Sequence, residues 1–223
     1  MATFAERRAK MVDRQLRRRG ITDERVLAAM AEVPRELFVP EGIRRRAYAD
    51  AALPIGSGQT ISQPWIVAAT LEGLGLRGGE RVLEVGGGSG YTAALLARLA
   101  SRVTSVELLP ELTTEARRAL ILAGADLDRI DLVTGDGSAG WPEGAPYDAI
   151  ALHAAVPGEP RKVLDQLAPG GHLVAPVVEG GEETLTMYWR DPAGEKRFPH
   201  QPIAACRFVP MLGAEGFRGS GTV

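Results

Sequence analysis

A glycine-rich turn followed by an acidic residue gives the sequence its clearest chemical signal. In LEVGGGSGYTAALLA, which begins at Leu83, the residues Gly86, Gly88 and Gly90 follow an apolar run typical of a buried strand. Glycine there lets the main chain approach a ligand closely, and the helix that follows offers unpaired N–H groups at its start. Glu107 stands about 20 residues beyond the glycines, where an acidic side chain can accept both hydroxyls of a ribose. These residues predict a nucleotide-like ligand.

A further acidic residue, Asp136, stands in the stretch TGDG and could accept the amino group of an adenine. Each signal also has a purely structural explanation, because glycine often serves a turn and a carboxylate at a strand end is often only solvated. Asp136 and Gly137 could likewise form a bare turn. Three consecutive strand ends that each carry a suitable residue favour ligand binding. A dinucleotide-dependent oxidoreductase is a more distant alternative, since its fingerprint needs a glycine where Tyr91 stands.

A second unusual stretch, LPIGSGQTISQP, gathers small hydrogen-bonding residues between Leu53 and Pro64. Pro64 fits the first turn of an expected helix that runs toward Gly73. Because Ser62 stands just before that helix, the residues alone favour a role as its cap.

The elements that must position these residues alternate between strand and helix. Four short β-branched or apolar runs are expected strands, and helix-length segments separate the first three. The expected strands are 81–85, 103–107, 130–134 and 147–152, and the expected helices are 91–100 and 110–123. This alternation predicts right-handed βαβ units, and therefore a parallel sheet with helices on its faces.

The two ends of the chain follow other patterns. Residues 4–30 predict two short helices broken at Gly20, with Thr22 or Asp23 capping the second. Near the other end, HLVAPVV, TLTMYWR and IAACRFVP follow one another with only Gly-, Asp- and Pro-rich links. Such runs predict an antiparallel edge that closes the sheet.

The composition indicates one globular domain. The 223 residues, of which 45% are hydrophobic and 24% charged, suffice for one domain of generous size. We expect a helical N-terminal layer with the polar loop in 1–62, the sheet core in 63–180 and antiparallel strands in 181–223. The net charge is −2, and the arginine runs 17–19 and 44–46 lack neighbouring aromatic residues that could stack on bases. A nucleic-acid partner is therefore not expected.

The cysteine and histidine residues bear on the cellular compartment and on metal binding. The single cysteine, Cys206, cannot form an internal disulfide, and no long apolar segment is present, so we expect a cytoplasmic protein that does not bind a membrane. His172 and His200 have no metal-ligand spacing to a partner, and no metal is expected. We expect a monomer.

With these features in hand, the chain resembles the class I S-adenosylmethionine-dependent methyltransferases. Within that class it is similar to the protein-L-isoaspartate (D-aspartate) O-methyltransferase family. The resemblance covers almost the whole length, through MVDRQLRRRGITDERVLAAMAEVPRELFVPE, AYADAALPIGSGQTISQP, RVLEVGGGSGYTAALLA, GDGSAGWPEGAPYDAI, VLDQLAPGGHLVAPV and RFVP, in family order. The block IGSGQTISQP is the most specific, because general methyltransferases have no reason to carry it.

The resemblance implies a doubly wound, Rossmann-like α/β fold and methyl transfer from S-adenosylmethionine to the free carboxylate of L-isoaspartyl or D-aspartyl residues. The products would be S-adenosylhomocysteine and an ester that closes to a succinimide, which is a repair reaction. In the family the serine of TIS lies between substrate and cofactor, so the resemblance assigns Ser62 a catalytic role and Thr60 and Ile61 a part in binding the carboxylate. A related alternative is a peptide-tailoring homologue that methylates aspartate in a dedicated partner peptide, to form an aspartimide or isoaspartate.

Two departures from the family pattern bear on the site. Family members commonly have threonine or serine where Gly87 stands, and bacterial ones usually read VTAA where this chain reads LHAA, with His153 in place of the threonine. His153 could line the substrate cleft and change which peptide is preferred, although a lone histidine is more often structural. The predicted cofactor-binding residues are Gly86, Gly88, Ser89, Gly90, Glu107, Leu108, Asp136 and Gly137, and the predicted substrate-binding residues are Thr60, Ile61, Ser62 and His153.

Overall fold

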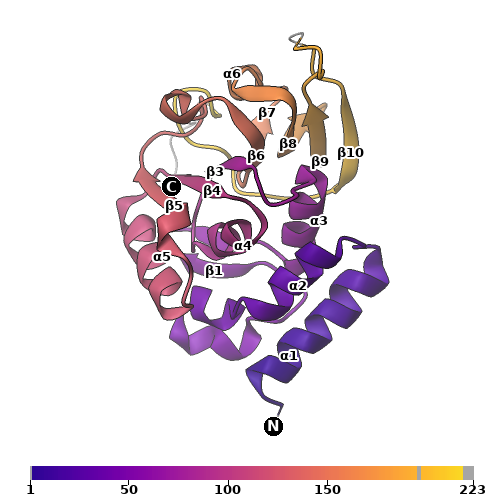
Figure 1. Cartoon of the computed structure of the whole chain (residues 1–223). Helices are drawn as coiled ribbons and strands as arrows, with labels where there is room; N and C mark the ends of the chain where they lie inside the picture. The colour runs from indigo at the N-terminus through magenta and orange to yellow at the C-terminus, as the bar shows by residue number, and fades with distance from the viewer. Residues whose placement is uncertain (1, 195–196, 218–223) are drawn as a thin grey trace.

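A mostly parallel sheet forms the centre of the protein in the computed structural model, which describes residues 2–194 and 197–217 (Figure 1). The strand order is β10-β9-β8-β6-β3-β4-β5, and β7 pairs with β8. The strands are β3 Arg81–Val85, β4 Arg102–Glu107, β5 Ile130–Thr134, β6 Tyr147–Leu152, β7 Val156–Pro157, β8 Leu167–Glu179, β9 Glu182–Trp189 and β10 His200–Ala205. The four strands expected from the sequence are all present, and β4 begins one residue earlier than expected.

The direction of winding reverses at β3. From β3 the chain passes to β4 and β5 on one side, while β6 and then β8 lie on the other side, all in parallel pairs. This arrangement is that of a doubly wound sheet, and the gap between β3 and β6 is its switch point. Alternate residues of β3 enter different cores, because Val82 and Leu83 point to opposite faces and both are fully buried.

Helices cover the two faces unequally. The helices α3 Pro64–Leu74, α4 Tyr91–Leu99 and α5 Pro110–Leu122 contribute to the larger core on one face, and the short α6 Arg161–Leu164 packs on the other. Both α3 and α5 begin with proline, whose missing N–H is not needed in the first turn. Among the described residues no helix is long and apolar enough to cross a membrane.

The N-terminal layer packs on the face that carries α3 and α4. It contains α1 Phe4–Met11, a π turn η1 Val12–Leu16, 3-10 turns η2 Arg17–Arg19, η3 Arg35–Phe38 and η4 Glu41–Arg46, and the helix α2 Glu24–Glu32. In Figure 1 the indigo helices α1 and α2 lie at the bottom of the view, and the orange strands β9 and β10 at the upper right. The predicted break at Gly20 is confirmed, since this residue has a left-handed φ of 94°. The second helix is capped by Asp23, which accepts hydrogen bonds from two main-chain N–H groups.

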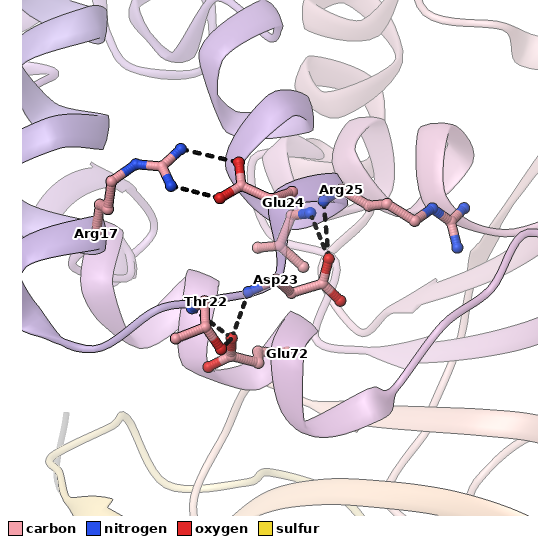
Figure 2. Close-up of polar contacts among 7 residues, drawn as sticks. Arg17, Thr22, Asp23, Glu24, Arg25 and Glu72 are labelled. Atoms are coloured by element: carbon pink, nitrogen blue, oxygen red, sulfur yellow. Dashed lines mark hydrogen bonds and ion pairs between the residues drawn. The ribbon is translucent and has the colours of Figure 1, made fainter.

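Glu72 of α3 connects the N-terminal layer to the sheet core by hydrogen bonds (Figure 2). Its carboxylate accepts main-chain hydrogen bonds of 2.7 Å from both Thr22 and Asp23. The nearby Arg17–Glu24 ion pair is exposed and contributes little, because water screens it. The attachment therefore depends on buried side chains and on the main-chain contacts of Glu72.

The polar stretch before α3 forms an antiparallel hairpin rather than an irregular loop. Its strands are β1 Leu53–Gly56 and β2 Gln59–Ile61, and in the described part of the chain they pair only with each other. Ser57 occupies the turn with a positive φ of 49°, and its hydroxyl donates to Glu111 of α5 over 3.1 Å. The hairpin thus bridges from the N-terminal layer to α5.

The C-terminal edge is antiparallel, as predicted, with two corrections. Strand β8 pairs in parallel with β6 and antiparallel with β9, so it joins the two halves of the sheet. Strand β10 spans His200–Ala205, and the predicted strand residues from Cys206 onward lie outside it. The main chain of Cys206 and Phe208 is instead held by Glu183, through its carbonyl and its carboxylate respectively.

Candidate functional site

A cavity opens at the carboxyl ends of β3, β4, β5 and β6, beside the switch point of the sheet. It encloses about 840 Å³, including its open mouth. Its walls come from the hairpin, the glycine turn, the ends of three further strands and the C-terminal segment. The lining residues are Ile55, Gln59, Thr60, Ile61, Ser62, Val85, Gly86, Gly87, Gly88, Ser89, Tyr91, Thr92, Val106, Glu107, Leu108, Leu109, Gly137, His153, Ala154, Val209, Pro210, Met211 and Leu212.

The glycine turn forms the floor of this cavity. Gly88 has a φ of +52°, and an added Cβ there would lie 3.4 Å from Cδ1 of Ile55 in the hairpin. Gly87 has a packing reason for its identity, because an added Cβ would lie only 2.4 Å from the hydroxyl oxygen of Ser105. At this departure from the family pattern, Ser105 thus occupies the space that a side chain at position 87 would need.

Glu107 is held in place by the turn it faces. One carboxylate oxygen accepts a 2.8 Å hydrogen bond from the N–H of Gly88, and the other accepts a 3.0 Å bond from the N–H of Leu109. Its neighbour Leu108 is 37% exposed and presents an apolar surface to the cavity. Together they offer a charged acceptor and an apolar surface side by side, which suits a nucleoside.

Asp136 binds the main chain of the C-terminal segment. Its carboxylate accepts hydrogen bonds from the N–H groups of Ser138 at 2.9 Å and Ala214 at 2.8 Å. Burial raises the pKa of Asp136, but its hydrogen bonds with Ala214 and Ser138 outweigh this effect, and the pKa lies below its ordinary value. An added Cβ at Gly213 would lie 2.1 Å from the Asp136 carboxylate, so the segment passes directly over it.

The hairpin contributes the opposite wall through Thr60, Ile61 and Ser62. Ser62 does not cap the helix that follows: the capping position of α3 is Gln63, and no side chain makes a capping hydrogen bond there. The carbonyl of Ser62 instead accepts a 2.7 Å hydrogen bond from the buried guanidinium of Arg35. The structural explanation for Ser62 favoured by the residues alone is therefore wrong.

His153 lies over a buried carboxylate. Its Nε2 is 3.4 Å from Oε1 of Glu84, a residue of β3 that is fully buried. The other oxygen of Glu84 is bound by the hydroxyl of Ser105. His153 lines the cavity, and among the described residues it is the only basic one that forms the walls. Neither Nε2 of His153 nor Oε1 of Glu84 has a hydrogen-bond partner of good geometry in the described part of the chain, so a substrate-binding role for His153 stays a prediction.

Most of the residues predicted from the sequence meet at this cavity. Gly90 and Asp136 are outside its lining, and the contacts of all these residues with a cofactor or substrate stay predictions. Gly90 packs against α5, since an added Cβ would lie 3.1 Å from Cβ of Ala116. Sequence reasoning missed Arg35, Glu84 and the lining residues 209–212, because their positions depend on contacts between distant segments.

The cavity lining offers hydrogen-bond donors and a carboxylate to a ligand. No group of three or more histidine, cysteine or acidic residues in the described part of the chain is placed to hold a metal ion. The walls offer hydroxyls, main-chain N–H groups, the imidazole of His153 and one charged acceptor, Glu107. They can therefore orient a charged ligand by hydrogen bonds.

Comparison with known proteins gives one consistent result. The family model described as protein-L-isoaspartate(D-aspartate) O-methyltransferase matches residues 6–216. A protein-L-isoaspartate O-methyltransferase of Methanoculleus marisnigri is 50% identical over 212 residues, covering 95% of this chain and 94% of the relative. Protein-L-isoaspartate O-methyltransferase 1 of Rhodopseudomonas palustris is 49% identical over 216 residues, covering 96% and 86%.

Solved structures agree on the fold. A protein-L-isoaspartate O-methyltransferase structure has a TM-score of 0.78 and 29% identity, and the match covers 93% of this chain and 66% of that one. A Plasmodium falciparum protein described as a putative protein-L-isoaspartate O-methyltransferase, in complex with S-adenosyl-L-homocysteine, also has a TM-score of 0.78, at 23% identity, covering 92% and 98%. The second match bears on the fold alone.

Proposed function

We infer the function of this chain from one premise, namely that it belongs to the protein-L-isoaspartate (D-aspartate) O-methyltransferase family. As a member of that family it is an S-adenosylmethionine-dependent methyltransferase. Its substrates are peptides and proteins that contain isoaspartyl residues, and methylation of their free carboxylate begins repair through a succinimide. The individual roles below are our proposals for this chain.

The cofactor fits the floor and the acidic end of the cavity. Gly86 and Gly88 leave the turn without side chains where the main chain must approach a ligand closely, and both have positive φ values, of 84° and 52°. Glu107 borders the cavity beside the apolar Leu108 and would accept the ribose hydroxyls. Ser89 and Gly137 complete this wall, while Gly90 and Asp136 would support it from outside the lining.

Neutral donors on the hairpin suit a carboxylate nucleophile. An aspartyl-type carboxylate has an ordinary pKa of about 4, so it is ionised at neutral pH and needs no general base. The main chain of Thr60 and Ile61 and the hydroxyl of Ser62 can hold it while leaving one lone pair free. A cation in direct contact would compete for that lone pair. The absence of arginine and lysine from the described cavity lining is the observation that carries this proposal.

When bound, S-adenosylmethionine supplies a methyl group on a positively charged sulfur. The task of the protein is then alignment and exclusion of water. Ser62 would orient the attacking oxygen, the glycine turn would fix the position of the methyl donor, and the hairpin would shield both from solvent. We propose that the protein acts as a monomer in the cytoplasm, where the free Cys206 would stay reduced.

The repair function and the tailoring alternative differ in one measurable preference. An isoaspartyl residue presents its free carboxylate one methylene closer to the main chain than an aspartyl side chain does. Because misplacement by about 1 Å can cost 100-fold in rate, we expect isoaspartyl peptides to be methylated at least about 100-fold faster than their aspartyl counterparts. Methyl transfer to two versions of one peptide tests this expectation. Equal or faster methylation of the aspartyl version would favour tailoring.

A further inference from the structure

A buried cation stands directly behind the hairpin wall. The side chain of Arg35, from η3, is 0% exposed. Its Nε donates to the carbonyl of Ala47 over 2.8 Å, and its Nη2 donates to the carbonyl of Ser62 over 2.7 Å. Within the described residues no carboxylate lies within 4.0 Å of this guanidinium, and the two hydrogen bonds of good geometry that it makes are to neutral main chain.

The nearest acidic neighbour in the sequence is occupied elsewhere. Glu36 is bound by the hydroxyl of Tyr48, and its other close contact is Arg8, at 4.0 Å. Burial lowers the pKa of Arg35 from its ordinary value, while Tyr91 and Tyr48 oppose that change. Arginine keeps its charge in proteins at neutral pH. The charge of Arg35 is therefore buried and has no carboxylate in contact, which is a costly arrangement that packing alone does not require.

Two neighbours of this guanidinium are themselves walls of the cavity. Ser62 accepts its hydrogen bond, and the ring of Tyr91 lies with its centroid 4.9 Å from the guanidinium carbon. Neither Nη1 of Arg35 nor the hydroxyl of Tyr91 has a hydrogen-bond partner of good geometry in the described part of the chain. The positive charge is thus separated from the cavity by a single layer of residues. Charges act more strongly across a protein interior than across water.

We propose that Arg35 is a positioning residue for the substrate carboxylate, which it attracts through the hairpin wall while it holds the main chain of Ser62. This proposal rests on the proposed function. Because the guanidinium does not touch the carboxylate oxygens, it raises the affinity for a charged ligand without occupying the lone pair that attacks the methyl group. The arrangement explains how a wall of neutral donors holds an anion.

The test compares a charged ligand with a neutral one of nearly the same shape. Binding of an isoaspartyl peptide and of its isoasparaginyl analogue is measured by calorimetry in the presence of S-adenosylhomocysteine. In Arg35→Gln we expect the affinity for the isoaspartyl peptide to fall at least tenfold and the affinity for the analogue to change less than threefold. Arg35→Lys should keep most of the preference for the carboxylate, because it keeps the charge.

A matched control comes from the same layer. Arg25 also donates to two main-chain carbonyls, those of Leu76 and Leu99, but does not line the cavity or contact its walls. Arg25→Gln should bind both peptides as the wild type does. Equal weakening of both peptides by Arg35→Gln would reduce Arg35 to a structural residue and overturn the proposal.

Further outcomes show whether this inference or the proposed function is at fault. If Arg35→Gln does not fold, Arg35→Lys decides, since loss of the carboxylate preference in a folded lysine variant overturns the proposal. If the wild type methylates isoaspartyl peptides but charge selectivity does not depend on Arg35, this inference alone fails. If the wild type methylates no isoaspartyl peptide, the proposed function itself fails.

Discussion

The two walls of the cavity are built in opposite ways. The wall to which we assign the cofactor, the cofactor wall, consists of the glycine turn and the end of β4, where Glu107 accepts hydrogen bonds from the N–H groups of Gly88 and Leu109. The wall to which we assign the substrate, the substrate wall, is a short hairpin, and the Ser62 carbonyl at its end accepts a hydrogen bond from Arg35, 27 residues earlier in the chain. The first wall is a local product of two strand ends, whereas the second requires separate layers to pack correctly.

This difference explains how each wall can fail. A change in the cofactor wall removes a contact with the ligand and leaves the rest of the cavity in place, because the turn is fixed by the sheet. A change behind the substrate wall displaces a group that must be aligned with the methyl donor. We therefore expect variants of the cofactor wall to lower affinity and variants of the substrate wall to lower the rate.

The largest effect is expected at Ser62. Removing one donor aimed at a reacting group commonly costs about 100-fold or more in rate, so Ser62→Ala should lower single-turnover methyl transfer by about that factor. Its melting temperature should stay near that of the wild type, because the hydroxyl does not cap α3. Thr114→Ala, which removes an exposed hydroxyl of α5 outside the cavity lining, is the control. A destabilised Ser62→Ala with a wild-type rate would contradict this role.

Glu107 should show the reverse pattern. Losing a hydrogen bond to a charged group costs about 1.5–3 kcal/mol, so Glu107→Ala should weaken S-adenosylmethionine binding by about that amount in calorimetry. At saturating cofactor its single-turnover rate should approach that of the wild type. Glu143→Ala, remote from the cavity, should leave the affinity unchanged. Unaltered affinity in Glu107→Ala would remove this residue from the cofactor wall.

The rigidity of the cofactor wall can be tested at Gly87. An added methyl group would lie 2.4 Å from the hydroxyl oxygen of Ser105, and overpacking of this kind costs about 1–3 kcal/mol of unfolding free energy. Gly87→Ala should therefore destabilise the protein, and should do so much less in a Ser105→Ala background. At Gly79 nothing lies within 4 Å of an added Cβ, so Gly79→Ala is the control. Equal costs in both backgrounds would show that Ser105 does not fill the site.

The smallest effect is a pH dependence at the edge of the cavity. Because hydrogen bonds hold the pKa of Asp136 below its ordinary value of 3.8, they stabilise the folded state at higher pH and are lost as the pH falls through the folded-state pKa. Since Asp136 is exposed, the contribution should be below about 1 kcal/mol. The stability difference between wild type and Asp136→Asn in chemical unfolding should shrink below about pH 4. A difference that grows on acidification would contradict this sign.

The contrast between the two walls also explains how much of the fold and of the site could be predicted from the sequence. The strands β3, β5 and β6 have the expected bounds, because each is a short apolar run between turn residues. The meeting of the glycine turn and Glu107 at one cavity could be predicted, because it depends on strand ends about 20 residues apart. The hairpin was missed because strands of four and three residues are too short to show an alternating pattern. Arg35 could not be found, since its partners are carbonyl groups, which no sequence pattern reveals.

The central claim is that methyl donor and carboxylate are held by separate walls. Single-turnover methyl transfer to an isoaspartyl peptide, measured across cofactor concentrations, tests it most directly when applied to Ser62→Ala, Glu107→Ala and the double variant. Changes at independent sites add in free energy, so the loss of efficiency in the double variant should equal the product of the two single losses. A double variant no worse than the poorer single one would contradict the claim, because it would mean that Ser62 and Glu107 serve one shared interaction.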